Sequence, residues 1–192
     1  MIIAPETIFS ILIGIGLAAS VGFRIFVPLF ALSLASFYNI IPLNENWEWV
    51  GSSNALIILG IATIVEILAY FIPWFDNLLD TIAVPLAAVA GTAVMVATVS
   101  DLSPTITWAL AIIAGGGTAT AIKGSTSTTR LASTATTAGI ANPVISTVET
   151  GSSIFMSIIA IFLPLLAIIF VVLIFWLLFK IFKLFKPSKS NK

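Results

Sequence analysis

The sequence predicts an all-α fold, a polytopic transmembrane bundle of five to six crossings that forms one integral membrane domain over residues 1–192. Hydrophobic residues make up 59% of the chain and charged residues only 8%. The mean hydropathy of +1.18 lies far outside the range of soluble proteins. Apolar stretches also recur along the chain at about the 20 residues that a helix needs to cross a bilayer.

The first apolar stretch, residues 7–38, is too long for one simple span. It contains Arg24, which is costly inside a membrane, and Pro28, which removes a helical hydrogen bond. We therefore expect a broken or strongly kinked helix with Arg24 at the break. The alternative is a long tilted helix whose Arg24 side chain reaches the membrane surface.

The remaining apolar stretches predict four further spans, and the loops between them carry an uneven distribution of charge. These spans are expected at residues 55–74, 82–99, 105–122 and 153–178, with Pro104 placed to start the third of them. The loop before the first of them contains the acidic residues Glu45 and Glu48, the tryptophans Trp47 and Trp49, and no basic residue. This composition is typical of the outer side of a membrane. Residues 180–192 hold five of the eight basic residues and are predicted to form a basic cytoplasmic tail.

A polar segment from Ser125 to Thr137 interrupts this apolar pattern, with nine hydroxyl residues in thirteen and Arg130 among them. Unsatisfied polar groups are expensive in hydrocarbon, so we expect the segment to be screened from lipid and to line a water- or ligand-filled path. Counting spans back from a cytoplasmic tail, the charge bias is satisfied if this segment crosses the membrane by itself. That count places the N-terminus inside and the acidic loop outside.

Small residues recur at every fourth position in three of the predicted spans, a spacing that lets helix backbones approach closely. The pattern predicts tight packing within a bundle or between copies of the chain, and we expect a homo-oligomer. Three consecutive glycines at 115–117 weaken the fourth span and predict a helix break or a close approach there. The small residues are Ser10, Gly14, Ala18, Gly22, Ala83, Ala87, Gly91, Ala111, Gly115 and Ala119.

Lys123 and Arg130 are seven residues apart, so one face of a helix would hold both. With hydroxyls such as Thr128 nearby, they predict a patch that binds an anion or a lipid headgroup. Ionisable residues at membrane depth point to function by default, but an internal ion pair that only fixes packing is the alternative. Arg24 is expected to pair with Glu66, which lies in the middle of the next span.

Two acidic residues, Asp76 and Asp80, lie one helical turn apart and could bind a divalent metal ion. The alternative is a solvated turn near the membrane surface. Asn142, with Pro143 and Glu149, is expected to end the polar segment and to begin an outer loop.

The chain has no cysteine and no histidine, which excludes disulfides, thiolate nucleophiles, histidine metal sites and Ser-His-Asp catalysis within it. No cofactor and no nucleic acid partner are expected. Membrane lipids and a small anionic ligand are the expected partners.

Several motifs together resemble a family of small bacterial membrane proteins that is catalogued only as a domain of unknown function. The resemblance covers most of residues 14–149. Two departures stand out: this chain has Val84 where relatives often carry Arg before the proline, and it lacks a His upstream of Lys123. The family has no assigned activity, but the resemblance implies that Arg24, Glu66, Asp76, Asp80, Lys123 and Asn142 form one constellation. The motifs are Gly16–Ser20 through Arg24 and Pro28, Glu66 through Pro73 and Asp76, Asp80 with Pro85 and Gly91, and Gly139 through Asn142-Pro143 to Ser146 and Glu149.

These observations favour a small transporter or channel-like protein for a small or anionic solute or a lipid headgroup. We expect it in the bacterial inner membrane with its C-terminus in the cytoplasm, and we do not expect an enzyme. One alternative is a non-transporting scaffold or accessory subunit whose small-residue surfaces bind partner helices. A lipid-metabolising membrane enzyme, suggested faintly by Asp76 and Asp80, is the other. The predicted ligand-binding residues are Arg24, Glu66, Lys123, Thr128, Arg130 and Asn142.

Overall fold

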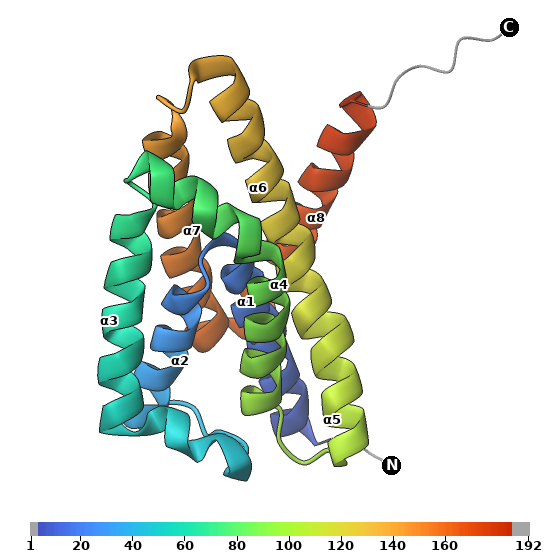
Figure 1. The fold of residues 1–192 in the computed structure, drawn as a ribbon. Coiled ribbons are helices and arrows are strands. Elements are labelled where there is room, and N and C mark those ends of the chain that lie inside the picture. Colours follow the sequence, from blue (N-terminus) through green and yellow to red (C-terminus); the bar gives the residue numbers. More distant parts are fainter. Residues whose placement is uncertain (1–3, 186–192) are drawn as a thin grey trace, which may run out of the picture.

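The computed structural model describes residues 4–185, apart from the side chains of residues 73, 74, 77, 184 and 185. Within this range every regular element is a helix, as the sequence predicts, and the helices form one elongated bundle (Figure 1). The predicted tail begins inside the last helix, and its residues 186–192 lie outside the described range. The elements are α1 (Pro5–Phe23), α2 (Phe26–Phe37), η1 (Glu45–Gly51), α3 (Ser53–Ala69), α4 (Pro73–Thr98), α5 (Pro104–Leu110), η2 (Ala111–Gly116), α6 (Gly117–Thr137), α7 (Asn142–Phe162) and α8 (Pro164–Phe185).

Proline defines where many of these helices begin. α5 begins at Pro104, as predicted, and α1, α4 and α8 also begin at a proline. α7 has Pro143 as its second residue. Proline suits these positions because its missing N–H would have no partner in the first turn of a helix.

The first apolar stretch folds as a helical hairpin that is broken at Arg24. This residue has extended backbone angles, φ −139° and ψ 134°, between α1 and α2. The predicted break is therefore confirmed. α2 then turns back, so that the start of α1 and the end of α2 lie at the same, lower end of the bundle (Figure 1). Two contacts with the last turns of α4 agree with this return. Gly14 of α1 lies against Met95, and the backbone N–H of Asn44, which follows α2, donates to the carbonyl of Ala97.

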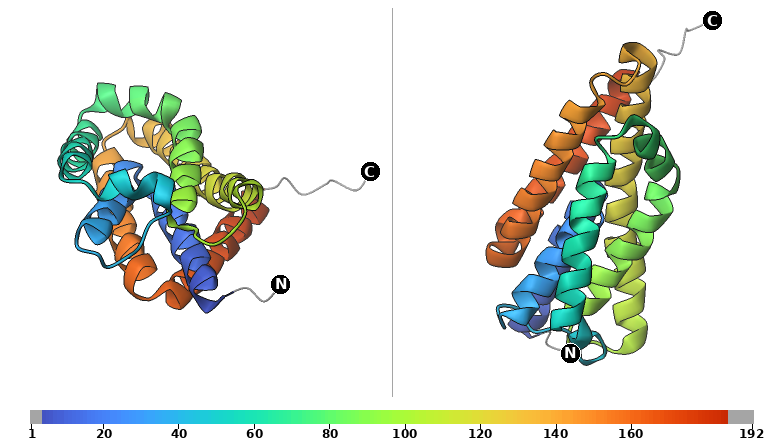
Figure 2. Two further views of the ribbon diagram at one scale, coloured as in Figure 1. Left: turned by 90° about the horizontal axis from the view of Figure 1, so that it is seen from below. Right: turned by 60° about the vertical axis from the view of Figure 1, so that its left-hand side comes forward.

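This hairpin corrects the predicted topology. The N-terminal end of α1 lies on the same side as the acidic loop, and the C-terminal end of α8 lies at the opposite end of the bundle (Figures 1 and 2). A kinked span and a hairpin contain the same run of apolar residues, so composition does not separate them.

Five helical segments among the described residues are long and apolar enough to cross a membrane, or six if the bent pair η1 and α3 counts as one span. The predicted five to six crossings are confirmed, but the polar segment is not a crossing of its own. It forms the second half of a continuous span, Pro104–Thr137. Residues 144–152, which we expected in an outer loop, belong to α7.

The small residues hold the centre of the bundle together, with α1 packed against α4, α6 and α7. A Cβ atom added to Gly22 would lie 2.5 Å from the Cβ of Ile122, and one added to Gly91 would lie 2.5 Å from the Cβ of Ala119. Close helix packing is therefore confirmed within the chain. Gly115 also meets Gly91, and the predicted break at the glycines is instead a widened π turn, η2, in an unbroken helical segment.

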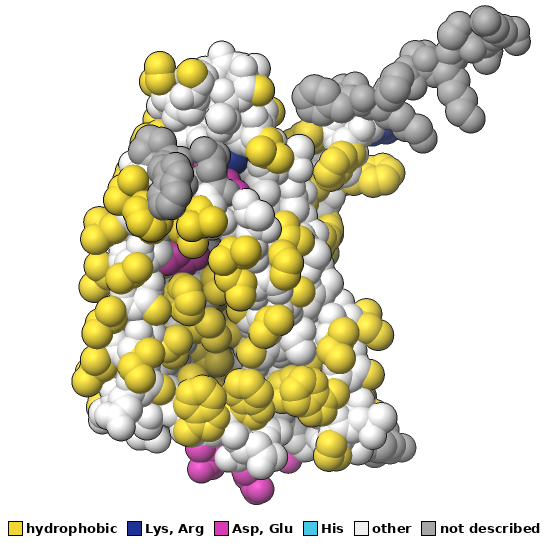
Figure 3. All heavy atoms as spheres, in the orientation of Figure 1, with side chains coloured by type: hydrophobic (Ala, Val, Ile, Leu, Met, Phe, Trp, Pro, Cys, Tyr) yellow, Lys and Arg dark blue, Asp and Glu magenta, His cyan; other side chains and the backbone are white. Residues whose placement is uncertain are grey.

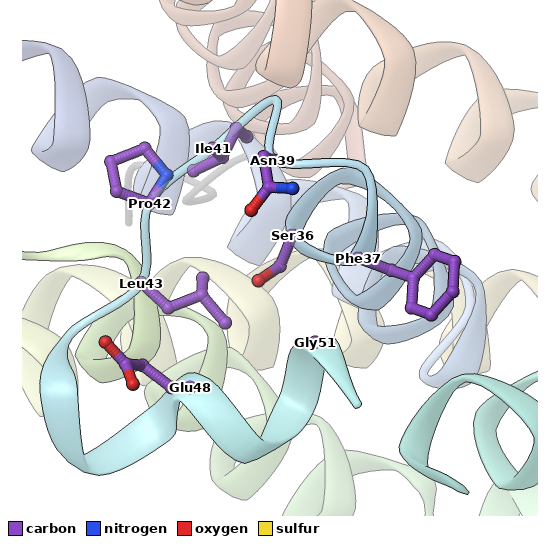
Figure 4. Close-up of a pocket in the computed structure, with 8 residues that line it drawn as sticks. All are labelled: Ser36, Phe37, Asn39, Ile41, Pro42, Leu43, Glu48 and Gly51. Carbon is purple, nitrogen blue, oxygen red and sulfur yellow. The ribbon is translucent and has the colours of Figure 1, made fainter. Parts of the chain in front are cut away.

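Apolar side chains cover much of the face of the bundle drawn in Figure 3, and acidic side chains lie at its lower end. α3 shows the reason, because its exposed face carries Ile57, Ile61 and Leu68 while Glu66 is buried. A hollow of about 500 Å³ lies beside the end of α2 and η1, with Ser36, Asn39 and Glu48 in its lining (Figure 4).

A buried charged cluster as the candidate functional site

All three basic residues that precede position 180 converge in one place inside the bundle. Arg24 comes from the break after α1, and Lys123 and Arg130 come from one face of α6, as their spacing predicts. Their side chains surround the ring of Tyr70, which follows α3. Arg24 Cζ lies 4.0 Å, Arg130 Cζ 4.4 Å and Lys123 Nζ 5.3 Å from the ring centroid. Such cation–π contacts contribute most where water is excluded.

Arg130 is fully engaged by carboxylates. Its Nε lies 3.1 Å from both oxygens of Glu149, its Nη2 donates to Glu149 Oε2 at 2.5 Å, and its Nη1 donates to Asp76. Asn142 joins this network, because its amide donates to Asp76 Oδ2 at 2.9 Å and to Thr134 at 3.0 Å. A planar guanidinium suits this fork of acceptors. Arg130 is thus held by the protein itself.

Arg24 has a different carboxylate partner from the one we predicted. Its Nη2 lies 3.7 Å from Glu149 Oε2 and donates to the hydroxyl and the carbonyl oxygen of Ser146. Its Nε donates to Thr150 at 3.0 Å. The predicted pair of Arg24 with Glu66 is therefore wrong. Because α7 runs beside the break, the acceptors of Arg24 are side chains and a carbonyl oxygen of α7.

Glu66 contacts α2, the second helix of the hairpin. Its two carboxylate oxygens accept the backbone N–H groups of Ile25 at 2.8 Å and Phe26 at 2.9 Å. These N–H groups lie at the N-terminus of α2, where a helix lacks internal acceptors and carries partial positive charge. Glu66 thus stabilises the break from a neighbouring helix.

Lys123 is the least satisfied member of the cluster. Its side chain is 0% exposed, and the only hydrogen bond found for its ammonium among the described residues goes to the carbonyl oxygen of Phe23, at 3.3 Å. Further buried polar atoms of the cluster residues and of α6 beside them have no partner within the described part of the chain. Among them are Arg24 Nη1, the hydroxyl of Ser127 one turn along α6, and the acceptor Oδ1 of Asn142. Buried polar groups are normally hydrogen-bonded, so three adjacent groups with spare donors need an explanation.

Apart from Ser127 and Thr134, the hydroxyls of the polar segment make no detected contact with the side chains of the cluster among the described residues, and several bond their own helix. Thr128, a predicted ligand-binding residue, is exposed, and its hydroxyl donates to the carbonyl of Gly124 at 2.7 Å. Ser125 and Thr129 bond the carbonyls four residues before them in the same way. These bonds within the helix satisfy the hydroxyls, so the segment can face outward without a polar path beside it.

The two candidate metal ligands are engaged by other groups. Asp76 is buried and accepts from Arg130 and Asn142, and Asp80 accepts weakly from the Tyr70 hydroxyl at 3.5 Å. Among the described residues, no group of three or more acidic side chains is arranged to hold a metal ion. A metal at Asp76 and Asp80 stays a prediction.

The structure brings together Arg24, Glu66, Lys123, Arg130 and Asn142, with Asp76 beside them. Three members had no predicted role in the site: Tyr70, Ser127 and Glu149. Tyr70 resembles an ordinary aromatic residue at a helix end, and Ser127 is one hydroxyl among many. Glu149 carried a usable signal, since it lies seven residues after Asn142 and would share its face if that stretch were helical.

Residues 11–183 match the family model described as Domain of unknown function (DUF4126). Neither a curated protein nor a solved structure matches the chain. The matched region contains the whole buried cluster and extends over most of the described helices. The chain therefore belongs to this family of membrane-embedded helical proteins of unknown function.

Proposed function

We propose that the buried cluster binds a small anion and that the protein moves this anion across the membrane. The observation that carries the proposal is the fully buried ammonium of Lys123, whose only detected acceptor in the described part of the chain is one carbonyl oxygen. An unpaired buried charge is strongly destabilising, of the order of 3–5 kcal/mol when a partner is removed. An anion at Lys123 would also accept hydrogen bonds from Ser127 and from the free Nη1 of Arg24.

The buried carboxylates of the cluster are already engaged, and among the described residues the half-buried Asp80 accepts only from the Tyr70 hydroxyl, at 3.5 Å. Glu149 and Asp76 are committed to Arg130, and Glu66 is committed to the N-terminus of α2. Formal charge is balanced among the buried groups, but Lys123, Arg24 and Ser127 keep spare donors without an acceptor among the described residues. An exogenous oxyanion, free in water or on a lipid headgroup, would supply the negatively charged hydrogen-bond acceptor that the Lys123 ammonium lacks.

The experiment measures thermal stability of the purified protein against inorganic phosphate, acetate and glycerol phosphate. Stabilisation by a ligand rises with its concentration. We expect it in the parent and in Lys123→Arg, a large reduction in Ser127→Ala and a loss in Lys123→Gln. Thr128→Ala is the matched control, because this neighbouring hydroxyl is exposed and bonded to its own helix. Equal shifts in the parent and in Lys123→Gln would overturn the binding site.

Flux in proteoliposomes tests the second half of the proposal with the anion that stabilises best. We expect uptake by the parent and none by Lys123→Gln. Binding without flux would overturn transport and leave a structural anion site. We further propose a bacterial inner-membrane location, a cytoplasmic C-terminus and a homo-oligomer, supported by the lysines at 180–192 and the apolar outer face.

The small-residue surfaces on which the scaffold alternative depends are covered by other helices of the same chain. A scaffold requires small-residue faces that are open to partner helices, but Gly14, Gly22, Gly91 and Gly115 all meet other helices of the same chain. We therefore favour the binding site over the scaffold.

A further inference from the structure

An apolar groove of about 530 Å³ runs between α6 and α8. α8 packs on α1 and α7 and leans away from α6 toward its upper end (Figure 1). The wall on α8 is aromatic and aliphatic, and the wall on α6 is formed by Ala121 and Ser125. The hydroxyl of Ser125 donates to the carbonyl of Ala121 at 2.9 Å, so the groove makes no demand for a polar occupant. The α8 wall includes Val172, Phe175, Trp176, Phe179 and Phe182.

Two lysines lie at the upper end of this groove. Lys183 follows Phe179 by four residues and Trp176 by seven, so it continues the stripe of α8 that forms the wall. Lys180 follows Trp176 by four residues, and its ammonium lies 5.2 Å from the centroid of the Trp176 ring. The groove is therefore apolar along its length and cationic at the end where α8 finishes.

We propose that this groove is a binding site for an anionic phospholipid, with its acyl chains against Trp176 and Phe179 and its phosphate at Lys180 and Lys183. Basic residues next to the end of a membrane helix attract anionic headgroups, and the aromatic wall is complementary to acyl chains. The site is separate from the Lys123 cluster and does not depend on the anion proposed there. A groove between α4 and α5, about 350 Å³ in volume, offers a comparison, because Trp47, Val89 and Trp108 line it and no basic residue does.

Tryptophan fluorescence tests the proposal in vesicles of brominated phosphatidylglycerol mixed with unlabelled phosphatidylcholine, and in the reverse mixture. One full-length variant keeps only Trp176 and another keeps only Trp108, with phenylalanine at the other tryptophans. We expect bromine on phosphatidylglycerol to quench Trp176 with at least about fivefold preference over phosphatidylcholine, since each nearby lysine contributes about that factor. At Trp108 we expect no preference between the two lipids.

Charge-matched variants separate a specific site from general attraction to the basic tail. Lys180→Gln with Lys183→Gln should remove most of the preference at Trp176, whereas Lys189→Gln with Lys192→Gln, which removes the same charge, should keep most of it. Ala121→Phe, which fills the groove, should reduce quenching of Trp176 by both lipids. Equal losses in the two lysine pairs, or equal preference at Trp108, would overturn the proposal in favour of non-specific lipid. No quenching of Trp176 by either lipid would overturn it in favour of a second copy of the chain.

Discussion

Glu66 of α3 caps the neighbouring helix α2, because its Oε1 accepts the backbone N–H of Ile25 at 2.8 Å and its Oε2 accepts that of Phe26 at 2.9 Å. A carboxylate thus takes the place that water would take at an exposed helix end. The contact fixes the start of α2 directly after Arg24, which itself reaches toward α7. Glu66 and Arg24 therefore hold the two sides of the same break rather than each other.

Removing the Glu66 cap should destabilise the protein in proportion to the acceptors lost. Glu66→Ala leaves one buried and one half-buried N–H group unpaired and should lower the free energy of unfolding by about 2 kcal/mol or more. Glu66→Gln keeps one acceptor oxygen and should give an intermediate loss. Unfolding by SDS in mixed micelles, followed by circular dichroism, measures both. The control is Thr63→Ala on the same helix, because the Thr63 hydroxyl bonds the Leu59 carbonyl. A loss of stability in Thr63→Ala as large as that in Glu66→Ala would contradict the capping role.

The buried pair of Arg130 and Glu149 should show strong coupling in a double-mutant cycle. Arg130→Gln or Glu149→Gln alone leaves an uncompensated buried charge, at a cost of about 3–5 kcal/mol, and the double variant should lose much less than the sum. The same cycle on Arg24 and Glu66 should be closer to additive, since Arg24 pairs with Glu149. A larger coupling for Arg24 with Glu66 would show that our assignment of partners is wrong.

Two nearby glycines on the same helical segment should respond in opposite ways to alanine. A Cβ at Gly115 would lie 2.5 Å from the carbonyl oxygen of Gly91, so Gly115→Ala forces α4 and η2 apart and should cost about 1–3 kcal/mol. A Cβ at Gly117 meets nothing within 4 Å, so Gly117→Ala should be neutral or stabilise by up to about 1 kcal/mol. Thermal unfolding of both variants measures the difference. A loss of stability in Gly117→Ala comparable to that in Gly115→Ala would rule out close packing as the cause.

The hairpin of α1 and α2 makes a prediction about sidedness that single cysteines can test, because the chain has none of its own. Glu6→Cys and Glu48→Cys should react with a membrane-impermeant reagent from the same side of intact cells. Ile140→Cys, in the exposed turn between α6 and α7, should react only from the other side. Labelling of Glu48→Cys together with Ile140→Cys from one side, with Glu6→Cys reacting only from the other, would restore the topology that charge counting predicts.

The sequence predicted the helical bundle, the break at Arg24 and the shared face of Lys123 and Arg130, because hydropathy, helix-breaking residues and helical spacing act locally. It did not predict which helix returns beside which. Both the hairpin and the partner of Arg24 depend on where α7 lies, and that depends on contacts far apart in the chain. The hydroxyl-rich segment misled for a related reason: composition counts Thr128 and Thr129 as polar groups, but each is satisfied by its own helix.

The balance of charge in the cluster has a consequence for how the protein responds to membrane voltage. Among the buried groups, Arg24, Lys123 and Arg130 are matched in formal charge by Glu66, Asp76 and Glu149, while Asp80 beside Tyr70 is half-buried. A rearrangement that carries these six groups together therefore moves no net charge through the membrane field, which otherwise acts on each elementary charge with about 2.3 kcal/mol per 100 mV. If an anion binds at Lys123, as we propose, these six groups and the anion together carry a net negative charge. Only the loaded protein would then sense the voltage, so the field would bias the loaded step and leave the return of the empty site unaffected.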